Sequence, residues 1–199
     1  FESLLPNADG SDTDDAIYFI FIRDEVLCLK QGMPRPITQD EFRWLGVEVT
    51  FKHFLGKWQT KPCYVIDGTG PVPEGYVTIE LRSLMGKVEL AFFYLAGRAK
   101  QILEWHRDNQ FCGRCGARTC DHDIDRAKQC LRCGLLSYPR ISPSIIVLVQ
   151  KGDRMLLARN ANWPAGRYSA LAGFVEPGES GEQTVHREVH EEVGISVTN

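Results

Sequence analysis

Three glutamates near the end of the chain have the spacing of a divalent-metal site. Glu188 and Glu192 are four residues apart, and Glu191 precedes the second of them. On a helix this spacing places Glu188 and Glu192 one turn apart, with Glu191 on the adjacent flank. Carboxylates crowded in this way repel one another, and Mg²⁺, which takes one or two carboxylates together with substrate phosphates, relieves that repulsion. The pattern favours a cation site over a solvated acidic helix face.

The residues around these glutamates predict the element that positions them. Pro177 and Gly178 indicate a turn, and the following pattern predicts a helix from about Ser180 that ends at Gly194 as its C-cap. Arg187 follows Glu179 by eight residues, which places it on a nearby face. We therefore expect its guanidinium to hold that carboxylate through a bidentate pair.

A second set of chemically competent residues is formed by two matched cysteine pairs. Their spacing, C-x2-C-x14-C-x2-C, is typical of a closed four-thiolate zinc site that is structural rather than catalytic. We expect one Zn²⁺ per chain, because a disulfide or redox pair lacks the sequence context it needs. Cys120 and His122 fall between the pairs and could compete as ligands, but a closed site already has its four. The predicted ligands are Cys112, Cys115, Cys130 and Cys133.

The cysteine segment contains charges of both signs. Its basic residues are Arg114, Arg118, Arg126, Lys128 and Arg132, and its acidic residues are Asp121, Asp123 and Asp125. Zinc ribbons can bind nucleic acid, but this mixture favours a scaffolding role.

The composition is that of an ordinary globular protein. The 199 residues are 43% hydrophobic and 25% charged, and the net charge of −3 provides no global basic field for nucleic acid or an anionic membrane. No apolar run is long enough to cross a membrane, and no signal-like segment begins the chain. We expect a soluble, cytoplasmic protein with no membrane partner.

The order of the remaining patterns predicts an α+β protein. We expect a mostly-β domain over residues 1–97, a linking helix and zinc ribbon over 98–138, and a third domain over 139–199. Expected elements of the first part are strands at 16–21, 26–29, 47–55, 63–66 and 76–81, a short helix through Trp44, a loop at 67–75 and a helix at 88–107.

The stretch from Gly173 to Ile195 matches G-x5-E-x7-R-E-U-x-E-E-x-G-U, where U is aliphatic. This is the Nudix box, so the chain resembles a Nudix hydrolase. Upstream, the runs LAGRAKQILEWHRDNQFCGRCG and SYPRISPSIIVLV flank the zinc ribbon. This combination resembles the NADH pyrophosphatase (NAD diphosphatase) branch, and implies that the last domain is the first part of a Nudix α/β/α sandwich.

The resemblance implies an activity and its parts. Members hydrolyse the pyrophosphate of NAD(H) to NMN(H) and AMP, some act on NAD-capped RNA, and they work as homodimers with Mg²⁺ or Mn²⁺. The implied metal ligands are the Ala172 carbonyl, Glu188 and Glu192, with Glu191 as a further ligand or the general base. The implied substrate contacts are Phe174 and, from the partner subunit, Tyr138 around the adenine, with Asp125 and Arg82 elsewhere.

The chain departs from the family pattern after the box. The resemblance implies further strands, a second helix, a downstream glutamate and an SQPWPFP-like segment, whereas this sequence ends at Asn199. We therefore expect a truncated chain, and the sequence leaves open whether it closes its sandwich or turns over. Two other readings stay open: a Nudix hydrolase for another nucleoside diphosphate, such as ADP-ribose or a sugar nucleotide, or a zinc-ribbon binding or regulatory protein whose Nudix portion is inert.

Overall fold

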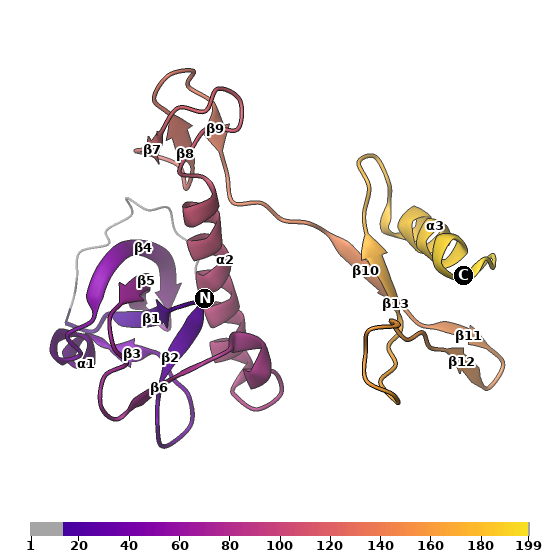
Figure 1. The fold of residues 1–199 in the computed structure, drawn as a ribbon, viewed down its shortest axis with the longest axis horizontal. Helices are drawn as coiled ribbons and strands as arrows, with labels where there is room; N and C mark the ends of the chain where they lie inside the picture. The colour runs from indigo at the N-terminus through magenta and orange to yellow at the C-terminus, as the bar shows by residue number, and fades with distance from the viewer. Residues whose placement is uncertain (1–13, 199) are drawn as a thin grey trace. The chain divides into compact units, whose positions relative to one another are not determined.

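The computed structural model describes residues 14–198, which divide into two compact units (Figure 1). Unit 1 ends at Pro139 and unit 2 begins at Arg140. The expected α+β class is confirmed, with the β-rich part first. Among the described residues, no helix is long and apolar enough to span a membrane.

A six-stranded sheet forms the centre of unit 1. Its path is β4-β5-β1-β2-β6, with β3 paired to β1, and β1 runs parallel to β5. The strands are β1 (Ile17–Ile22), β2 (Glu25–Leu29), β3 (Ile37–Thr38), β4 (Glu48–Trp58), β5 (Lys61–Thr69) and β6 (Tyr76–Ile79).

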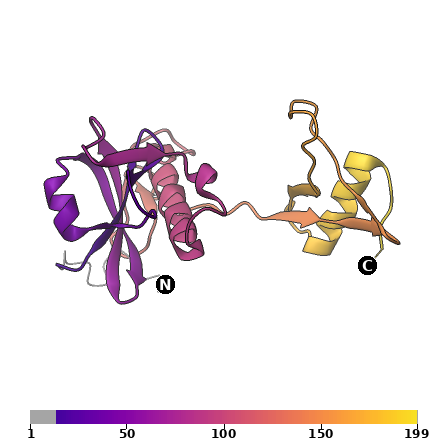
Figure 2. The same ribbon diagram turned by 90° about the horizontal axis from the view of Figure 1, so that it is seen from below.

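Both faces of β1 are buried, which explains its unbroken apolar run. Ile17, Phe19 and Phe21 face a cluster that contains the apolar side of α2 (Leu90–Asp108). The alternate residues of β1 join a second cluster with Phe42 of α1 (Gln39–Trp44). The two helices accordingly lie on opposite sides of the sheet (Figure 2). Side chains of a strand alternate between its faces, so one strand supplies both cores.

A small three-stranded sheet follows α2 within unit 1. It is built from β7 (Thr119–Asp121), β8 (Lys128–Cys130) and β9 (Leu136–Ser137), in that order. The end of α2 is joined to it by Asn109, whose side-chain oxygen accepts a hydrogen bond from the Ser137 hydroxyl at 2.6 Å.

Unit 2 contains two antiparallel strand pairs and one described helix. β10 (Ser144–Val147) pairs with β13 (Leu171–Phe174), and β11 (Val149–Lys151) pairs with β12 (Arg154–Leu156). Helix α3 (Gly181–Val193) packs on β10 and β13, and buries Val189 and Thr184. This is one strand layer with one helix layer against it.

Two expectations about local structure are wrong. The loop expected from Asp67 begins later, because β5 continues to Thr69 along β4. The strand expected to reach Leu81 ends at Ile79, and a 3₁₀ helix, η1 (Leu81–Leu84), follows. Leu81 and Leu84 are both buried, and one 3₁₀ turn brings residues three apart to the same side.

Candidate active site and metal centre

Helix α3 carries the three glutamates, and both of its ends are capped. The Ser180 hydroxyl accepts a hydrogen bond from the Gln183 backbone N–H at 3.3 Å, while the Gln183 side chain accepts from the Ser180 N–H at 2.8 Å. At the other end Gly194 adopts the left-handed conformation, with φ of 71°. These caps fix where the helix begins and ends, and thereby which side chains share a face.

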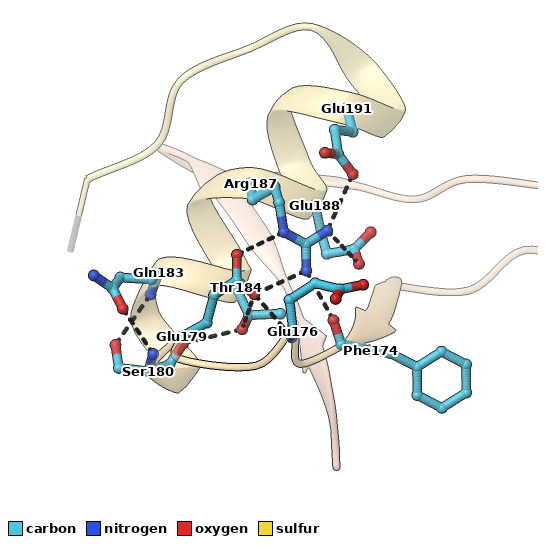
Figure 3. Close-up of polar contacts among 9 residues, drawn as sticks. All are labelled: Phe174, Glu176, Glu179, Ser180, Gln183, Thr184, Arg187, Glu188 and Glu191. Atoms are coloured by element: carbon cyan, nitrogen blue, oxygen red, sulfur yellow. Dashed lines mark hydrogen bonds and ion pairs between the residues drawn. The ribbon is translucent and has the colours of Figure 1, made fainter. Parts of the chain in front are cut away.

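Arg187 joins the helix to the turn before it. Its Nε and Nη2 donate to the two carboxylate oxygens of Glu179 at 2.7 and 2.9 Å, which is the expected bidentate pair (Figure 3). This contact lowers the pKa of Glu179 to about 2 and raises the pKa of Arg187. Glu179 is held further by the Glu176 backbone N–H at 3.1 Å and the Thr184 hydroxyl at 3.0 Å.

The same guanidinium also contacts the glutamates and the end of β13. Its Nη2 donates to the Phe174 carbonyl at 2.8 Å, and its Nη1 donates to Glu188 at 2.9 Å and to Glu191 at 3.1 Å. The Glu188 carboxylate lies against the backbone of Gly173. Arg187 therefore fixes the position of α3 relative to β13 and orients two of the three glutamates.

The third glutamate lines a cavity. Glu192, together with Ala172, contributes to a hollow of about 490 Å³ within unit 2. Arg159 and Trp163 lie in its wall, and the Arg159 Nη1 donates to the Trp163 carbonyl at 2.9 Å. Ala172 and Glu192 thus line one cavity, whereas Glu188 and Glu191 accept hydrogen bonds from Arg187. The donor set, carboxylates and a carbonyl oxygen, is the one that hard divalent cations prefer.

The four cysteines meet at a single point, although they come from two separate turns. All four sulfurs lie within 4.8 Å of one another, with Cys112–Cys133 at 3.6 Å and Cys115–Cys130 at 3.5 Å. A tetrahedron of sulfurs about 2.3 Å from zinc has edges of about 3.8 Å, so the cluster fits the ion. Within residues 14–198 this is the only such gathering of His, Cys, Asp or Glu side chains.

Backbone hydrogen bonds prepare one of these thiols for a metal. The N–H groups of Cys133 and Arg132 donate to the Cys130 sulfur at 3.4 and 3.3 Å and lower the pKa of its thiol to about 6. Cys120 lies apart and donates to the Gln129 carbonyl, and the His122 Nδ1 accepts from the Asp125 N–H. Neither belongs to the cluster.

The residues expected to contact substrate are all solvent-accessible, but they lie in two units. In unit 2, Phe174 is 64% exposed and its ring points away from the carboxylates (Figure 3). In unit 1, Tyr138 is 50% exposed, and its hydroxyl donates to Asp125 at 3.0 Å. Arg82 lies exposed on η1.

Sequence reasoning missed two parts of this arrangement. The Ser180–Gln183 capping box has a readable S-x-x-Q signature, so it could have been found. The link from Arg126 to β4 had no such signal: its Nε donates to His53 Nε2 at 3.1 Å and its Nη2 to the Phe54 carbonyl at 3.0 Å. That contact joins residues more than 70 positions apart and depends on the tertiary fold.

Three family models match consecutive parts of the chain. The NADH pyrophosphatase-like rudimentary NUDIX domain matches residues 15–105, and the NADH pyrophosphatase zinc ribbon domain matches residues 107–138. The NUDIX domain matches residues 139–199. The three matches follow one another along the chain in the order rudimentary NUDIX domain, zinc ribbon and NUDIX domain.

Similar curated proteins carry the name NAD-capped RNA hydrolase NudC. The protein from Pseudomonas aeruginosa strain LESB58 is 49% identical over 149 residues, which is 74% of this chain and 54% of that protein. The protein from Pseudomonas syringae pv. tomato is 45% identical over 79% of the chain and 57% of the relative. The protein from Stutzerimonas stutzeri strain A1501 is 42% identical over 89% of this chain and 64% of that protein. The chain therefore spans little more than half the length of the first two relatives.

Proposed function

The chain belongs to the zinc-ribbon NADH pyrophosphatase family of Nudix hydrolases, and from that premise we propose that the whole protein hydrolyses the pyrophosphate bond of NAD(H). The products are NMN(H) and AMP, and the same cleavage removes NAD caps from RNA. The relatives are named for cap hydrolysis, which supports the second substrate. The match to an NADH pyrophosphatase-like domain and to its zinc ribbon supports free NAD(H) as a substrate.

The observation that carries the proposal is the set of contacts made by Arg187. One guanidinium holds Glu179, Glu188, Glu191 and the Phe174 carbonyl. Ala172 and Glu192 line a cavity in the same unit. A purely solvated acidic face would not need this network. We assign Arg187 and Glu179 to positioning, and Glu191 to proton transfer from water or to metal binding.

The donor set supports a catalytic divalent cation, which we propose to be Mg²⁺ or Mn²⁺. Glu188, Glu192 and the Ala172 carbonyl would hold it, with Glu191 available as a further ligand. Such a cation neutralises phosphate charge and lowers the pKa of a bound water. The four cysteines would hold one zinc per chain, and that zinc would be structural because four protein thiolates leave no position open for substrate.

Substrate contacts and assembly follow from the family, and we propose them on that basis. In a homodimer, Phe174 of one subunit and Tyr138 of the partner subunit would stack on the adenine of the substrate. Both rings are exposed. Asp125 and Arg82 would provide the further acidic and basic contacts. The thiolate cluster requires reduced sulfurs, which supports our placing the protein in the cytoplasm.

The proposal is tested by comparing matched variants of α3. The purified whole protein is incubated with NADH and Mg²⁺ or Mn²⁺, and NMNH and AMP are separated chromatographically. Glu192→Gln should abolish product formation, whereas His190→Gln, an exposed change two residues away, should leave it unchanged. Equal activity of the Glu192→Gln variant and the unaltered protein would contradict the assignment.

A further inference from the structure

One end of the zinc ribbon presents three exposed arginines beside two exposed apolar side chains. Phe111 is 58% exposed and Leu131 is 70% exposed, and the three arginines are exposed as well. We call this surface the knuckle face, and its members are Phe111, Arg114, Arg118, Leu131 and Arg132. The zinc site uses none of these side chains.

Contacts within the ribbon show that the knuckle face is continuous. The Arg118 guanidinium lies over the Phe111 ring, 5.3 Å from its centroid, and the two residues form a backbone bridge. The Leu131 N–H donates to the Arg118 carbonyl at 3.2 Å. The Arg132 Nη1 donates to the Cys115 carbonyl at 3.4 Å, which brings it to the turn that carries Arg114. These contacts place the five residues in, or directly beside, the two turns that carry the cysteines.

The charges that are mixed in the sequence are separated in space. In the β7–β8 pair, Thr119 faces Cys130 at the cysteine end, and Asp121 faces Lys128 toward the other end. Asp123 and Asp125 lie in the connection beyond Asp121. Asp121 is itself paired with the buried Lys128 at 2.6 Å.

The three arginines of the knuckle face are not neutralised by any acidic side chain that the structure describes. Throughout the described part of the chain, no carboxylate forms an ion pair with any of them. The mixed charge of the whole cysteine segment favoured a scaffolding role. The knuckle face itself, however, presents only positive charges to a partner.

Guanidinium groups beside an exposed aromatic ring suit a polyanion that carries flat bases. Arginines bind phosphates bidentately and also stack, and an aromatic face binds unpaired bases with little sequence preference. A duplex hides its base faces, and an anionic membrane surface has none, so neither uses the ring. We propose that the knuckle face binds single-stranded RNA, as the chain that follows a 5′ cap. The link to a cap rests on the proposed function, whereas the RNA contact itself does not.

The direct test is the affinity of the protein for a fluorescein-labelled single-stranded RNA of about ten nucleotides, measured by anisotropy over a range of salt. The test variant carries Arg114→Gln, Arg118→Gln and Arg132→Gln. A matched variant removes three exposed charges elsewhere through Lys61→Gln, Lys87→Gln and Arg154→Gln. Each lost phosphate contact should flatten the slope of log K against log salt by about 0.7, hence by about 2 for the three. Equal losses of affinity in the two variants would overturn the proposal.

The aromatic contribution is tested separately with Phe111→Ala. Removing one stacking surface should weaken binding on the order of tenfold, with the salt slope unchanged. Zinc content near one per chain in every variant shows that the ribbon is intact. If a variant loses zinc, photocrosslinking of RNA to the unaltered protein decides the question. Crosslinked peptides that contain Phe111 or Leu131 support the proposal, and crosslinks confined to other peptides overturn it.

Hydrolysis assays distinguish a failure of this proposal from a failure of the proposed function. The arginine variant should hydrolyse free NAD(H) as the unaltered protein does, but should show a higher KM for NAD-capped RNA. An unchanged KM for capped RNA would contradict the role of the knuckle face even where NAD(H) is cleaved. Absence of hydrolysis with intact RNA binding would contradict only the proposed function.

Discussion

The carboxylate of Glu188 occupies the place that a side chain at Gly173 would need. A Cβ added to Gly173 would lie 1.9 Å from Glu188 Cδ and 2.1 Å from its Oε1. No real Cβ contact is this short, so either the glutamate or the strand would have to move. Gly173, which begins the box, and Glu188 on α3 therefore depend on each other geometrically, although they are fifteen positions apart in the sequence.

This contact predicts the effect of Gly173→Ala. The added methyl group would displace the Glu188 carboxylate, and a shift of about 1 Å at a catalytic group can cost about 100-fold in rate. We expect a fall in kcat of that order for NAD(H), measured by release of AMP. Gly181→Ala is the matched control, because a Cβ there meets nothing within 4 Å and alanine favours a helix. Similar rates for both variants would contradict the requirement.

Arg187→Lys should impair the site although the positive charge is kept. A lysine ammonium is a point charge and cannot reproduce a planar fork that contacts Glu179, Glu188, Glu191 and the Phe174 carbonyl together. Groups that orient metal ligands typically contribute 10- to 100-fold to activity or metal affinity, so we expect a loss of about that size.

The same variant distinguishes positioning from substrate binding. Because Arg187 acts through the glutamates, kcat should fall and the cation concentration for half-maximal rate should rise, while KM changes little. Arg154→Lys, at an exposed position of β12, should leave all three values unchanged. A change confined to KM would indicate that Arg187 contacts the substrate directly.

Removal of one zinc ligand should unfold the ribbon. Cys130→Ser replaces a buried sulfur whose thiol has a lowered pKa, so bound zinc should fall from about one per chain to well below half. The midpoint of thermal unfolding should drop by about 5 °C or more. Cys120→Ser lies outside the cluster and should keep its zinc. Loss of zinc in both variants would mean that the ligand set is wrong.

Unit 1 should lose stability as the pH falls below about 6.5. Burial lowers the pKa of His53 to about 4, helped by the Arg126 charge, and burial lowers the pKa of His106 likewise to about 4. Below the ordinary pKa of about 6.5 the unfolded chain binds protons that the folded chain does not. The free energy of unfolding should therefore decrease between pH 6.5 and about 4, and His53→Gln should reduce that decrease. An unaltered pH dependence in His53→Gln would contradict the assignment.

Local patterns were sufficient for some of this structure and insufficient for the rest. The end of α3 at Gly194, the Glu179–Arg187 pair and the meeting of four cysteines all follow from short spacings, because neighbouring residues on a helix or in a turn have few relative positions. The Arg126–His53 contact and the separation of arginines from aspartates depend on how distant segments pack and on strand register. Neither can be read from spacing alone.

Which bond is cleaved, and in which substrate, is decided by assaying several dinucleotides and nucleotides side by side. NAD⁺, NADH, ADP-ribose and a sugar nucleotide are incubated separately with the protein and Mn²⁺ or Mg²⁺, and every product is identified by mass. We expect NAD(H) to be cleaved between its two phosphates, giving AMP with NMN or NMNH, and the Glu192→Gln variant to give none of these products. Intact NAD(H) beside hydrolysed ADP-ribose or sugar nucleotide would contradict it.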